Sequence, residues 1–369
     1  MKILLTTDTV GGVWDHTVTL ARELDAAGHE VLVAVIGEPR DERLAALPAG
    51  VQVVWRAYRL EWMQDAADDV RAAGQWLRGI AEKWVPDVVH LNQIAYAVED
   101  FGAPVLVAVH SDVISWWPHV HGVEAPMEEW GTYRQWLRAG LRSADAVVTP
   151  TAYQGALVMR YYGMEITRVI HNGIHFVDEE TTPRQDGLVL SVGRLWDRGK
   201  GVDLLDEAAA LLRDEAPEIH VIGETVAPHG EAFSVRTVTA HGRVERVQVD
   251  EWMRRASVYV APSRYEPFGL APLEAALHGC ALVLSDIGTF RELWDGCAEF
   301  FPSGDALALA QAIRRVTHDD ARRARLARAA RTRAARRYTA RRMASEYMEL
   351  YHQMIRDHAK VPRRTEAVA

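Results

Sequence analysis

Apolar runs of strand length alternate along this chain with longer segments in which apolar residues recur at helical spacing. In the first half, the runs predict strands at Lys2–Thr7, Val31–Ile36, Val51–Trp55, Asp87–Asn92, Pro104–Val109 and Ala144–Thr149. In the second half, they predict strands at Leu188–Val192, Ile219–Gly223, Thr237–Gly242, Ser257–Ala261 and Ala281–Leu284. Strands joined through helices form parallel, right-handed βαβ units. The pattern therefore predicts an α/β protein.

The intervening segments predict helices at Thr17–Ala27, Asp65–Lys83, Met127–Arg142, Tyr153–Tyr162, Asp203–Leu212, Asp250–Ala256, Leu270–His278 and Asp305–Thr317. The following segment, Asp319–Arg342, is dense in Arg and Ala, with its charges on all faces. We interpret it as a solvated helix rather than a basic patch for acidic lipid or nucleic acid. Met343–Met354 is amphipathic and is expected to dock, whereas the residues from Lys360 onward are expected to fray.

The length of 369 residues favours two domains. The stretch Val177–Gly187 has the polar composition of a linker. We therefore expect a first domain at residues 1–175, a second at 176–340, and a C-terminal helix with its tail at 341–369.

Composition narrows the class of protein. The net charge of −9 makes nucleic acid an unfavourable partner. The apolar run at the N-terminus is too short for a signal peptide, and no stretch approaches the roughly 20 apolar residues that span a bilayer. Cys280 and Cys297 are the two cysteines, without CxxC spacing, which fits a reduced, cytoplasmic setting.

Two candidate sites follow strands of the first half, at the sheet edge where open α/β proteins bind ligands. Gly11-Gly12 comes after the first strand, but the GxGxxG of a dinucleotide site is missing, and an ordinary turn explains the pair equally well. His110 follows another strand. A single His is more often structural, so neither site is decisive by itself.

A basic loop follows the first strand of the second half. Gly193-Arg-Leu-Trp-Asp-Arg-Gly-Lys-Gly201 brings Arg194 and Lys200 to a strand end. Arg grips a phosphate bidentately and Lys adds a mobile charge, so the loop suits a diphosphate. It is not a Walker A motif. Arg198 is interpreted as a solvated neighbour.

The stretch Ala261–Leu284 predicts a strand, a tight loop, a helix and another strand. Glu266 lies in the loop and Glu274 in the helix. The backbone N–H groups of residues 268–270 fall at the start of this helix, where unpaired donors and a partial positive charge favour phosphate. Pro272 is tolerated because it lies in the first turn. Free amides flanked by acids suit a sugar attached to a nucleoside diphosphate.

Three further segments have simpler interpretations. Ser111–Trp130 is expected to be a loop with short helical pieces on the substrate side, and core packing is favoured over acceptor stacking for Trp116 and Trp117. Thr289 and Glu292 have the spacing of a capping box for the following helix. Asp286–Gly288, at another strand end, is a candidate for lining the sugar pocket.

With these motifs in this order, the chain resembles the family 4 glycosyltransferases of the GT-B fold from Met1 to about Tyr351. The likeness rests on Glu266 and Glu274, which have the EX7E spacing of that family, and on Arg194 with Lys200. The weaker matches in the same order are Gly11-Gly12, His110 and His171-Asn172-Gly173. The second Pro of the motif, Pro272, departs from the family pattern and is expected to be harmless.

The resemblance implies two Rossmann-like domains of mainly parallel sheet facing across a cleft, acceptor-side first and donor-side second, with the last helix crossing back to the first domain. It also implies roles for the motif residues. Arg194 and Lys200 would hold the donor diphosphate, Glu274 the ribose, and Glu266 the transferred sugar together with three backbone amides. Those amides are Phe268, Gly269 and Leu270. Gly11 and Gly12 would let phosphate or acceptor approach the first domain, and His110 would contact the sugar near the reacting carbon.

The implied reaction is transfer of a sugar from a nucleotide-sugar, favoured to be a UDP-sugar with GDP and ADP open, to a hydroxyl acceptor with retention of anomeric configuration. No metal or cofactor is expected. Since no carboxylate pair suggests a covalent intermediate, we favour attack from the face of the departing diphosphate, which takes the acceptor proton. A small molecule, a glycan and a lipid-linked sugar all fit as acceptor, with membrane contact at most peripheral.

Three alternatives remain. A GT-B nucleotide-sugar epimerase or hydrolase would act without an acceptor. A non-catalytic nucleotide-sugar-binding partner subunit would bind donor without turnover, although Arg194, Lys200, Glu266 and Glu274 are all present. An oxidoreductase is the least favoured because GxGxxG is missing.

Overall fold

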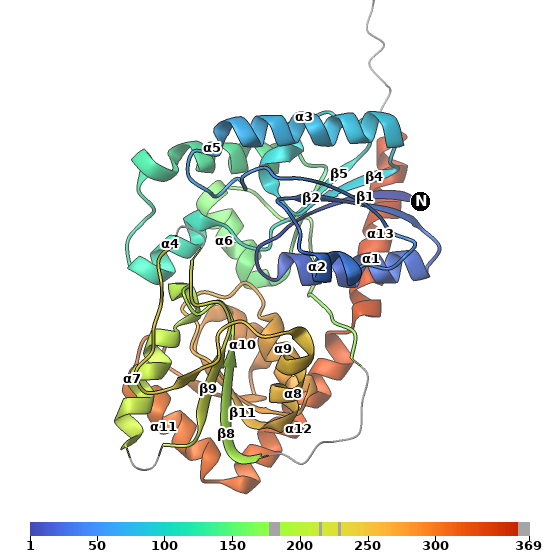
Figure 1. Cartoon of the computed structure of the whole chain (residues 1–369). Coiled ribbons are helices and arrows are strands. Elements are labelled where there is room, and N and C mark those ends of the chain that lie inside the picture. Colours follow the sequence, from blue (N-terminus) through green and yellow to red (C-terminus); the bar gives the residue numbers. More distant parts are fainter. Residues whose placement is uncertain (177–184, 214–215, 228–229, 361–369) are drawn as a thin grey trace, which may run out of the picture.

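The computed structural model describes residues 1–176, 185–213, 216–227 and 230–360. Figure 1 shows two α/β domains stacked one above the other, each with helices on both faces of a parallel sheet. The fold is therefore the predicted one, two Rossmann-like domains. Most of the expected linker, 177–184, and the tail, 361–369, lie outside the described residues.

The first sheet has the order β3-β2-β1-β4-β5-β6-β7, and all of its neighbouring strands are parallel. Its strands are β1 (Lys2–Asp8), β2 (Glu30–Ile36), β3 (Gln52–Arg56), β4 (Val88–Leu91), β5 (Val105–Ala108), β6 (Ala146–Thr149) and β7 (Arg168–Val169). Its helices are α1 (Val13–Ala26), α2 (Asp41–Ala45), α3 (Ala67–Trp84), η1 (Ile94–Val98), α4 (Val113–His121), α5 (Met127–Ser143) and α6 (Ala152–Tyr162). The central strands are buried on both faces, which explains their continuous apolar runs.

The second sheet is also parallel, in the order β10-β9-β8-β11-β12-β13. Its strands are β8 (Gln185–Val192), β9 (Ile219–Ile222), β10 (Thr239–Ala240), β11 (Ala256–Ala261), β12 (Ala281–Ser285) and β13 (Ala298–Phe301). Its helices are η2 (Arg198–Lys200), α7 (Val202–Leu212), α8 (Arg246–Arg255), α9 (Leu270–Leu277), α10 (Gly288–Trp294) and α11 (Ala306–Thr317). The sequence pattern does not predict the edge strands β7 and β13.

The Arg/Ala-rich segment is not one helix up to Arg342. It forms α12 (Asp320–Arg337) on the second domain, breaks at Tyr338, and continues as α13 (Ala340–His358). Thr339 causes the restart, because its side chain accepts a hydrogen bond from the amide of Arg342 and caps α13. Helix α13 packs its apolar face into the core beneath β1 and β2, as its red ribbon alongside the first domain shows (Figure 1).

The crossing point of α13 is tightly fitted. Gly173 lies so close to the chain at Thr339 that a Cβ on Gly173 would overlap the Thr339 carbonyl. The guanidinium of Arg342 donates to the carbonyl oxygen of Asn172 at 3.2 Å. The His171-Asn172-Gly173 motif therefore forms the seat on which the last helix returns to the first domain.

The two domains also meet through side chains. Tyr265 of the second domain is buried within the hydrophobic core of the first. Its hydroxyl group lies 2.8 Å from Ser115 Oγ and 3.3 Å from Gln154 Oε1. Beside it, the hydroxyl of Thr151 donates to the carbonyl oxygen of Pro267 at 2.9 Å. The loop that carries Glu266 is thus attached to the first domain on both sides of that residue.

No helix among the described residues combines the length and the apolar composition that crossing a bilayer requires.

Candidate active site

The β1–α1 turn faces the second domain. Gly11 has a left-handed φ of +76°, and a Cβ placed there would lie 3.0 Å from Arg194 Nη1. A Cβ on Gly12 would lie 3.3 Å from a methyl group of Leu270. Helix α1 begins at Val13, four residues earlier than expected, so its N-terminus follows the turn directly. The turn, Arg194 and the start of α9 therefore lie at one place between the domains.

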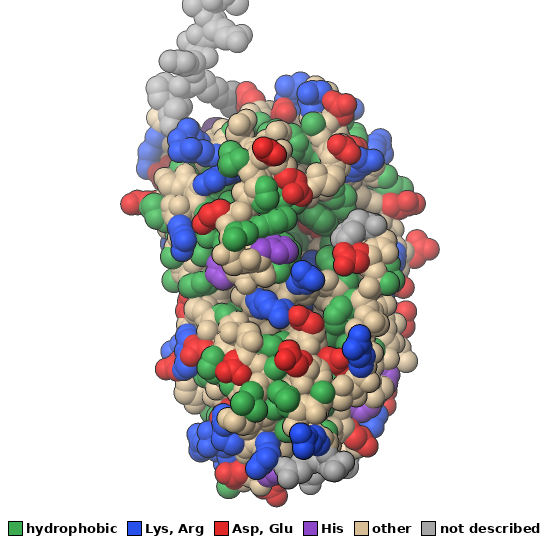
Figure 2. Space-filling model, turned by 90° about the vertical axis from the view of Figure 1, so that its left-hand side faces the viewer, with side chains coloured by type: hydrophobic (Ala, Val, Ile, Leu, Met, Phe, Trp, Pro, Cys, Tyr) green, Lys and Arg blue, Asp and Glu red, His purple; other side chains and the backbone are tan. Residues whose placement is uncertain are grey.

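The basic loop supplies two cations, each held by a carboxylate. Arg194 Nη2 donates to Asp197 Oδ2 at 2.7 Å. Lys200 Nζ donates to Glu266 Oε2 at 2.6 Å, across 66 residues of sequence. The Lys200 and Glu266 side chains are 25% and 11% exposed, so they remain accessible to a ligand. On the face that Figure 2 shows, basic and His side chains gather at the level where the two domains meet.

The Glu266–Glu274 stretch forms a sharp strand-to-helix turn. Gly269 has φ +92° at the N-cap of α9, and a Cβ there would press on Phe290 and on the Glu266 side chain. The Phe268 side chain packs in the second-domain core, so only its backbone is available to the loop. Among the described residues, no hydrogen bond occupies the amides of Phe268, Gly269 or Leu270. These amides are free to bind an anion at the helix N-terminus. Pro272 lies in the first turn of α9, where its missing N–H costs nothing.

Glu274 lies on α9, is 9% exposed and accepts a hydrogen bond from Arg246 Nη1 at 2.7 Å. Arg246 also pairs with Asp250 at 3.1 Å. Burial raises the pKa of the Glu274 carboxyl, although the charge of Arg246 acts in the opposite direction. Glu274 is thus a buried acceptor held by Arg246 rather than a solvated acid.

His110 follows β5 and is oriented by Asn92. The Asn92 amide nitrogen donates to Thr6 O at 2.7 Å and to Thr17 Oγ1 at 3.1 Å, so Asn92 Oδ1 faces His110 Nε2 at 2.8 Å. Nε2 therefore carries the ring proton, and Nδ1 is left as an acceptor. Burial lowers the pKa of His110 to about 4. His110 is consequently neutral near pH 7, so it can hydrogen-bond to a ligand hydroxyl group without adding charge.

Two other His rings lie beside His110. The His16 ring centroid is 4.5 Å from that of His110 and 6.4 Å from that of His90. His90 Nδ1 lies 2.6 Å from the hydroxyl group of Tyr351 on α13. Burial lowers the pKa of His90 to about 3, and burial with the neighbouring His rings lowers the pKa of His16 well below its ordinary value. Three neutral rings therefore lie between β1, β4 and the crossing helix.

This cluster gives a pH dependence of stability. A lowered pKa in the folded state means that the unfolded chain binds more protons, so stability falls as the pH drops below about 6.5. For one such His the slope approaches about 1.4 kcal/mol per pH unit. We expect His110→Gln to flatten the decrease in unfolding free energy between pH 7 and pH 5, measured by urea titration. His318→Gln, at an exposed site, is the control. Equal slopes for H110Q and the unmodified chain would contradict the assignment.

One sequence interpretation is corrected here. Thr289 and Glu292 do not form a capping box, since α10 has no side-chain cap. Instead the Glu292 carboxylate accepts from the amides of Ala152 and Tyr153, both at 2.9 Å, at the start of α6 in the first domain. A carboxylate is stabilised at a helix N-terminus, and Glu292 binds that of α6. Glu292 therefore joins the domains.

Asp286–Gly288 contributes to the same contact between the domains. Gly288 lies against the ring of Tyr153, which a Cβ would overlap. Asp286 pairs with Arg291 at 2.6 Å, and both side chains are more than 40% exposed. We find this segment at the domain contact and the surface, and no described contact joins it to Glu266.

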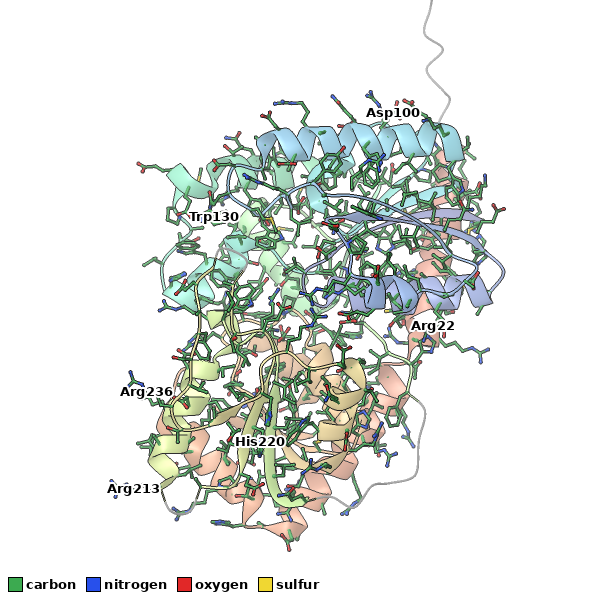
Figure 3. The ribbon with its side chains drawn as sticks, viewed as in Figure 1. Arg22, Asp100, Trp130, Arg213, His220 and Arg236 are labelled. Carbon is green, nitrogen blue, oxygen red and sulfur yellow. The ribbon has the colours of Figure 1, made fainter. Side chains whose placement is uncertain are left out.

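The segment Ser111–Trp130 is more helical than expected, because Asp112 caps α4 through the amide of Ser115. Trp116 and Trp117 pack against the first-domain core, as the favoured interpretation has it. Trp130 lies at the α4 side of that domain (Figure 3). Trp116 has one further contact: its indole N–H donates to Asp197 at 3.3 Å.

Several residues around the site make contacts that no sequence motif indicates. Arg246, Asp197 and Glu292 act across turns or domains, and spacing in the sequence does not reveal them. Asn92 is the exception, since a polar residue ending a buried strand is a usable signal. Nowhere among the described residues do three or more His, Cys, Asp or Glu side chains form a group suited to a metal ion.

Comparison with known proteins decides the family. The sequence model described as "Glycosyltransferase Family 4" matches residues 10–176, and "Glycosyl transferases group 1" matches residues 186–319. The chain belongs to glycosyltransferase family 4. This family membership confirms the resemblance found in the sequence. As a member of the family, the protein is an enzyme that transfers sugars.

The similarities extend over nearly the whole chain. Glycogen synthase of Mycobacterium tuberculosis is 28% identical, covering 93% of this chain and 91% of that protein. The structure of sucrose-phosphate synthase from Thermosynechococcus elongatus has a TM-score of 0.79 at 21% identity, covering 97% of this chain and all of the other. Anabaena HepE in complex with UDP-glucose has a TM-score of 0.73 at 18% identity, covering 96% of this chain and all of the other. At these identities the structures support the fold alone.

Proposed function

We propose that this glycosyltransferase moves a hexose from a nucleotide-sugar to a hydroxyl acceptor, with retention and with a UDP-sugar as the favoured donor. The observation that carries the proposal is the pairing of Lys200 with Glu266, beside Arg194 and the free amides that begin α9. Cations, backbone amides and carboxylates from motifs far apart in the sequence meet where β8 and β11 end. This set complements a diphosphate joined to a sugar.

The chemistry follows from the charges. As the bond from the anomeric carbon to the diphosphate breaks, negative charge grows on the leaving oxygen. Arg194 and Lys200 stabilise that charge, and the start of α9 adds its partial positive charge. The acceptor oxygen forms the new bond on the same face, and its proton passes to the departing phosphate. Glu266 holds sugar hydroxyls, and neutral His110 offers Nδ1 to another. Trapping a covalent sugar on any side chain would overturn this mechanism.

A thermal-shift panel tests the donor. UDP, GDP, ADP and their sugars are added singly, and a ligand at 100 times its Kd is expected to stabilise the fold by about 2.7 kcal/mol. We expect UDP and a UDP-sugar to give the largest shifts. Glu274→Ala should remove most of the shift because Glu274 is assigned to the ribose, whereas Glu251→Ala, on an exposed face of α8, should leave it unchanged. If UDP raises the unfolding temperature of E274A as much as that of the unmodified protein, Glu274 does not contact the ribose.

We propose that the reaction needs no divalent metal, because Arg194, Lys200 and the helix amides supply positive charge for the diphosphate. Product formation is therefore expected to continue in EDTA at its rate without EDTA. Inactivation by EDTA that Mg²⁺ reverses would refute this expectation.

A panel of hydroxyl compounds tests the acceptor. The similar proteins are named for a polysaccharide and for a sugar phosphate, so hydroxyl-bearing glycans and small sugars are the first acceptors to try. Release of free sugar at full rate without an acceptor would favour a nucleotide-sugar hydrolase, and donor binding without turnover a partner subunit. Both cysteines are free and buried, which supports a cytoplasmic setting.

A further inference from the structure

Asp197, in the middle of the basic loop, binds three groups that come from both domains. It is 6% exposed. Its Oδ2 accepts from Arg194 at 2.7 Å, and its Oδ1 accepts from the Gly199 amide at 2.8 Å and from the Trp116 indole N–H at 3.3 Å. Trp116 belongs to α4 of the first domain, and the other groups belong to the second. One carboxylate therefore links Arg194 to the opposite domain.

The contact with Trp116 is closely fitted. A Cβ on Gly199 would lie 2.6 Å from Trp116 Nε1, so only glycine lets the indole approach at this position. Trp116 itself packs against the first-domain core and is edge-on to Trp117, with ring centroids 6.1 Å apart. The indole is therefore fixed to the first domain and moves with it.

The carboxylate is a permanent acceptor. Burial acts to raise the pKa of Asp197, but the charges of Arg194 and Lys200 and the Gly199 amide outweigh burial and leave the pKa below its ordinary value. Arg194 has five N–H donors, and Asp197 occupies one at Nη2. Nη1 lies over Gly11, at the turn of the first domain. The guanidinium is thereby held at the junction of the domains, with donors left for a ligand.

We propose that Asp197 is a positioning residue that orients Arg194 for the donor diphosphate, and that Trp116 makes this orientation depend on contact between the domains. The proposal rests on the proposed role of Arg194. Arg is a long side chain that loses rotamer freedom when it binds, so holding it beforehand lowers that cost. Separation of the domains removes the indole donor from Asp197 and the Gly11 turn from Arg194. The cation is fully oriented only when the two domains are together.

Two variants separate the contacts, of which Asp197→Asn is nearly isosteric. Asp197→Asn can keep an oxygen toward Gly199 and Trp116, but it turns an N–H₂ donor toward the donor groups of Arg194. Trp116→Phe removes the indole N–H and keeps an aromatic ring. Asp203→Asn is the matched control, since Asp203 is a half-exposed acid of the next helix that pairs with Arg264.

The test measures the affinities of UDP and UMP by isothermal titration, with GDP and GMP or ADP and AMP substituted if the panel selects another base. We expect D197N to weaken diphosphate binding about tenfold, equal to about 1.4 kcal/mol, and W116F about threefold, a fraction of one hydrogen bond. Monophosphate binding should not change in either, and D203N should match the unmodified protein. A general loss of structure would weaken both nucleotides alike and would count against the proposal.

A double-mutant cycle completes the test, with Arg194→Ala as the second background. Because Asp197 and Trp116 act through Arg194, neither D197N nor W116F should weaken diphosphate binding further in R194A. If R194A weakens binding but D197N does not, or if the losses add, Asp197 is not a positioning residue. If R194A binds diphosphate normally, the proposed role of Arg194 fails first, and this inference fails with it.

Discussion

Replacing Lys200 by alanine is expected to lower turnover by roughly 100-fold or more, the scale of losing one charge contact in a transition state. The reason is local. Lys200 lies at the strand edge beside Arg194 and is paired with Glu266 at 2.6 Å. Without the ammonium group, the leaving diphosphate loses a cation, and Glu266 loses the partner that holds it. Both effects fall on the step in which the sugar leaves the phosphate, so kcat should drop more than the donor affinity.

The measurement is steady-state sugar transfer with the donor selected by the thermal-shift panel. Arg198→Ala is the matched control, because Arg198 is a cation of the same loop whose side chain is exposed. Its turnover should stay close to that of the unmodified protein. Unfolding temperatures of both variants should also stay close to normal, which separates chemistry from folding. An unchanged kcat in K200A would remove Lys200 from the mechanism.

Gly173→Ala is expected to have the largest effect on stability, about 3 kcal/mol or more, because the added methyl group overlaps backbone rather than a movable side chain. The atoms in its way belong to Thr339 and Ala340, where α13 begins. Relief requires α13 to shift from its seat against the first domain. The free energy of unfolding and the midpoint of thermal unfolding should both fall.

Gly79→Ala is the control for this variant. Gly79 lies within α3, and a Cβ there meets nothing within 4 Å. Ala is preferred to Gly inside a helix by roughly 0.5–1 kcal/mol, so G79A should be slightly more stable than the unmodified protein. Equal stabilities for G173A and G79A would mean that the seat of α13 is not rigid.

Much of the fold could be predicted from the sequence because parallel strands buried on both faces leave continuous apolar runs. The prediction failed where the signal is tertiary. Edge strand β13 has alternating burial, and the break between α12 and α13 depends on the Thr339 cap rather than on a Gly or Pro. The helix start at Val13 was hidden because Gly12, not a polar residue, is its N-cap.

The candidate site, too, could be predicted from the sequence only in part. Spacing marked Glu266, Glu274, Arg194 and Lys200 as candidates, since each lies in a short loop or in the helix that directly follows one. Spacing does not show which charged side chains pair with each other in the folded protein. Glu292 illustrates the limit: its distance from Thr289 fits a local cap, but it binds the start of α6, about 140 residues earlier. The network of Asp197, Trp116 and Gly199 is likewise visible only in three dimensions.

The burial of Tyr265 in the first domain restricts how this enzyme can be re-engineered. A chimera that takes its first half from a relative in order to change the acceptor must also supply partners for this tyrosine, which here are Ser115 and Gln154. Without them, a phenol from one parent would be enclosed unpaired in the core of the other. The practical unit of exchange is thus the first domain together with the loop at 262–268, which carries Glu266 of the proposed donor site.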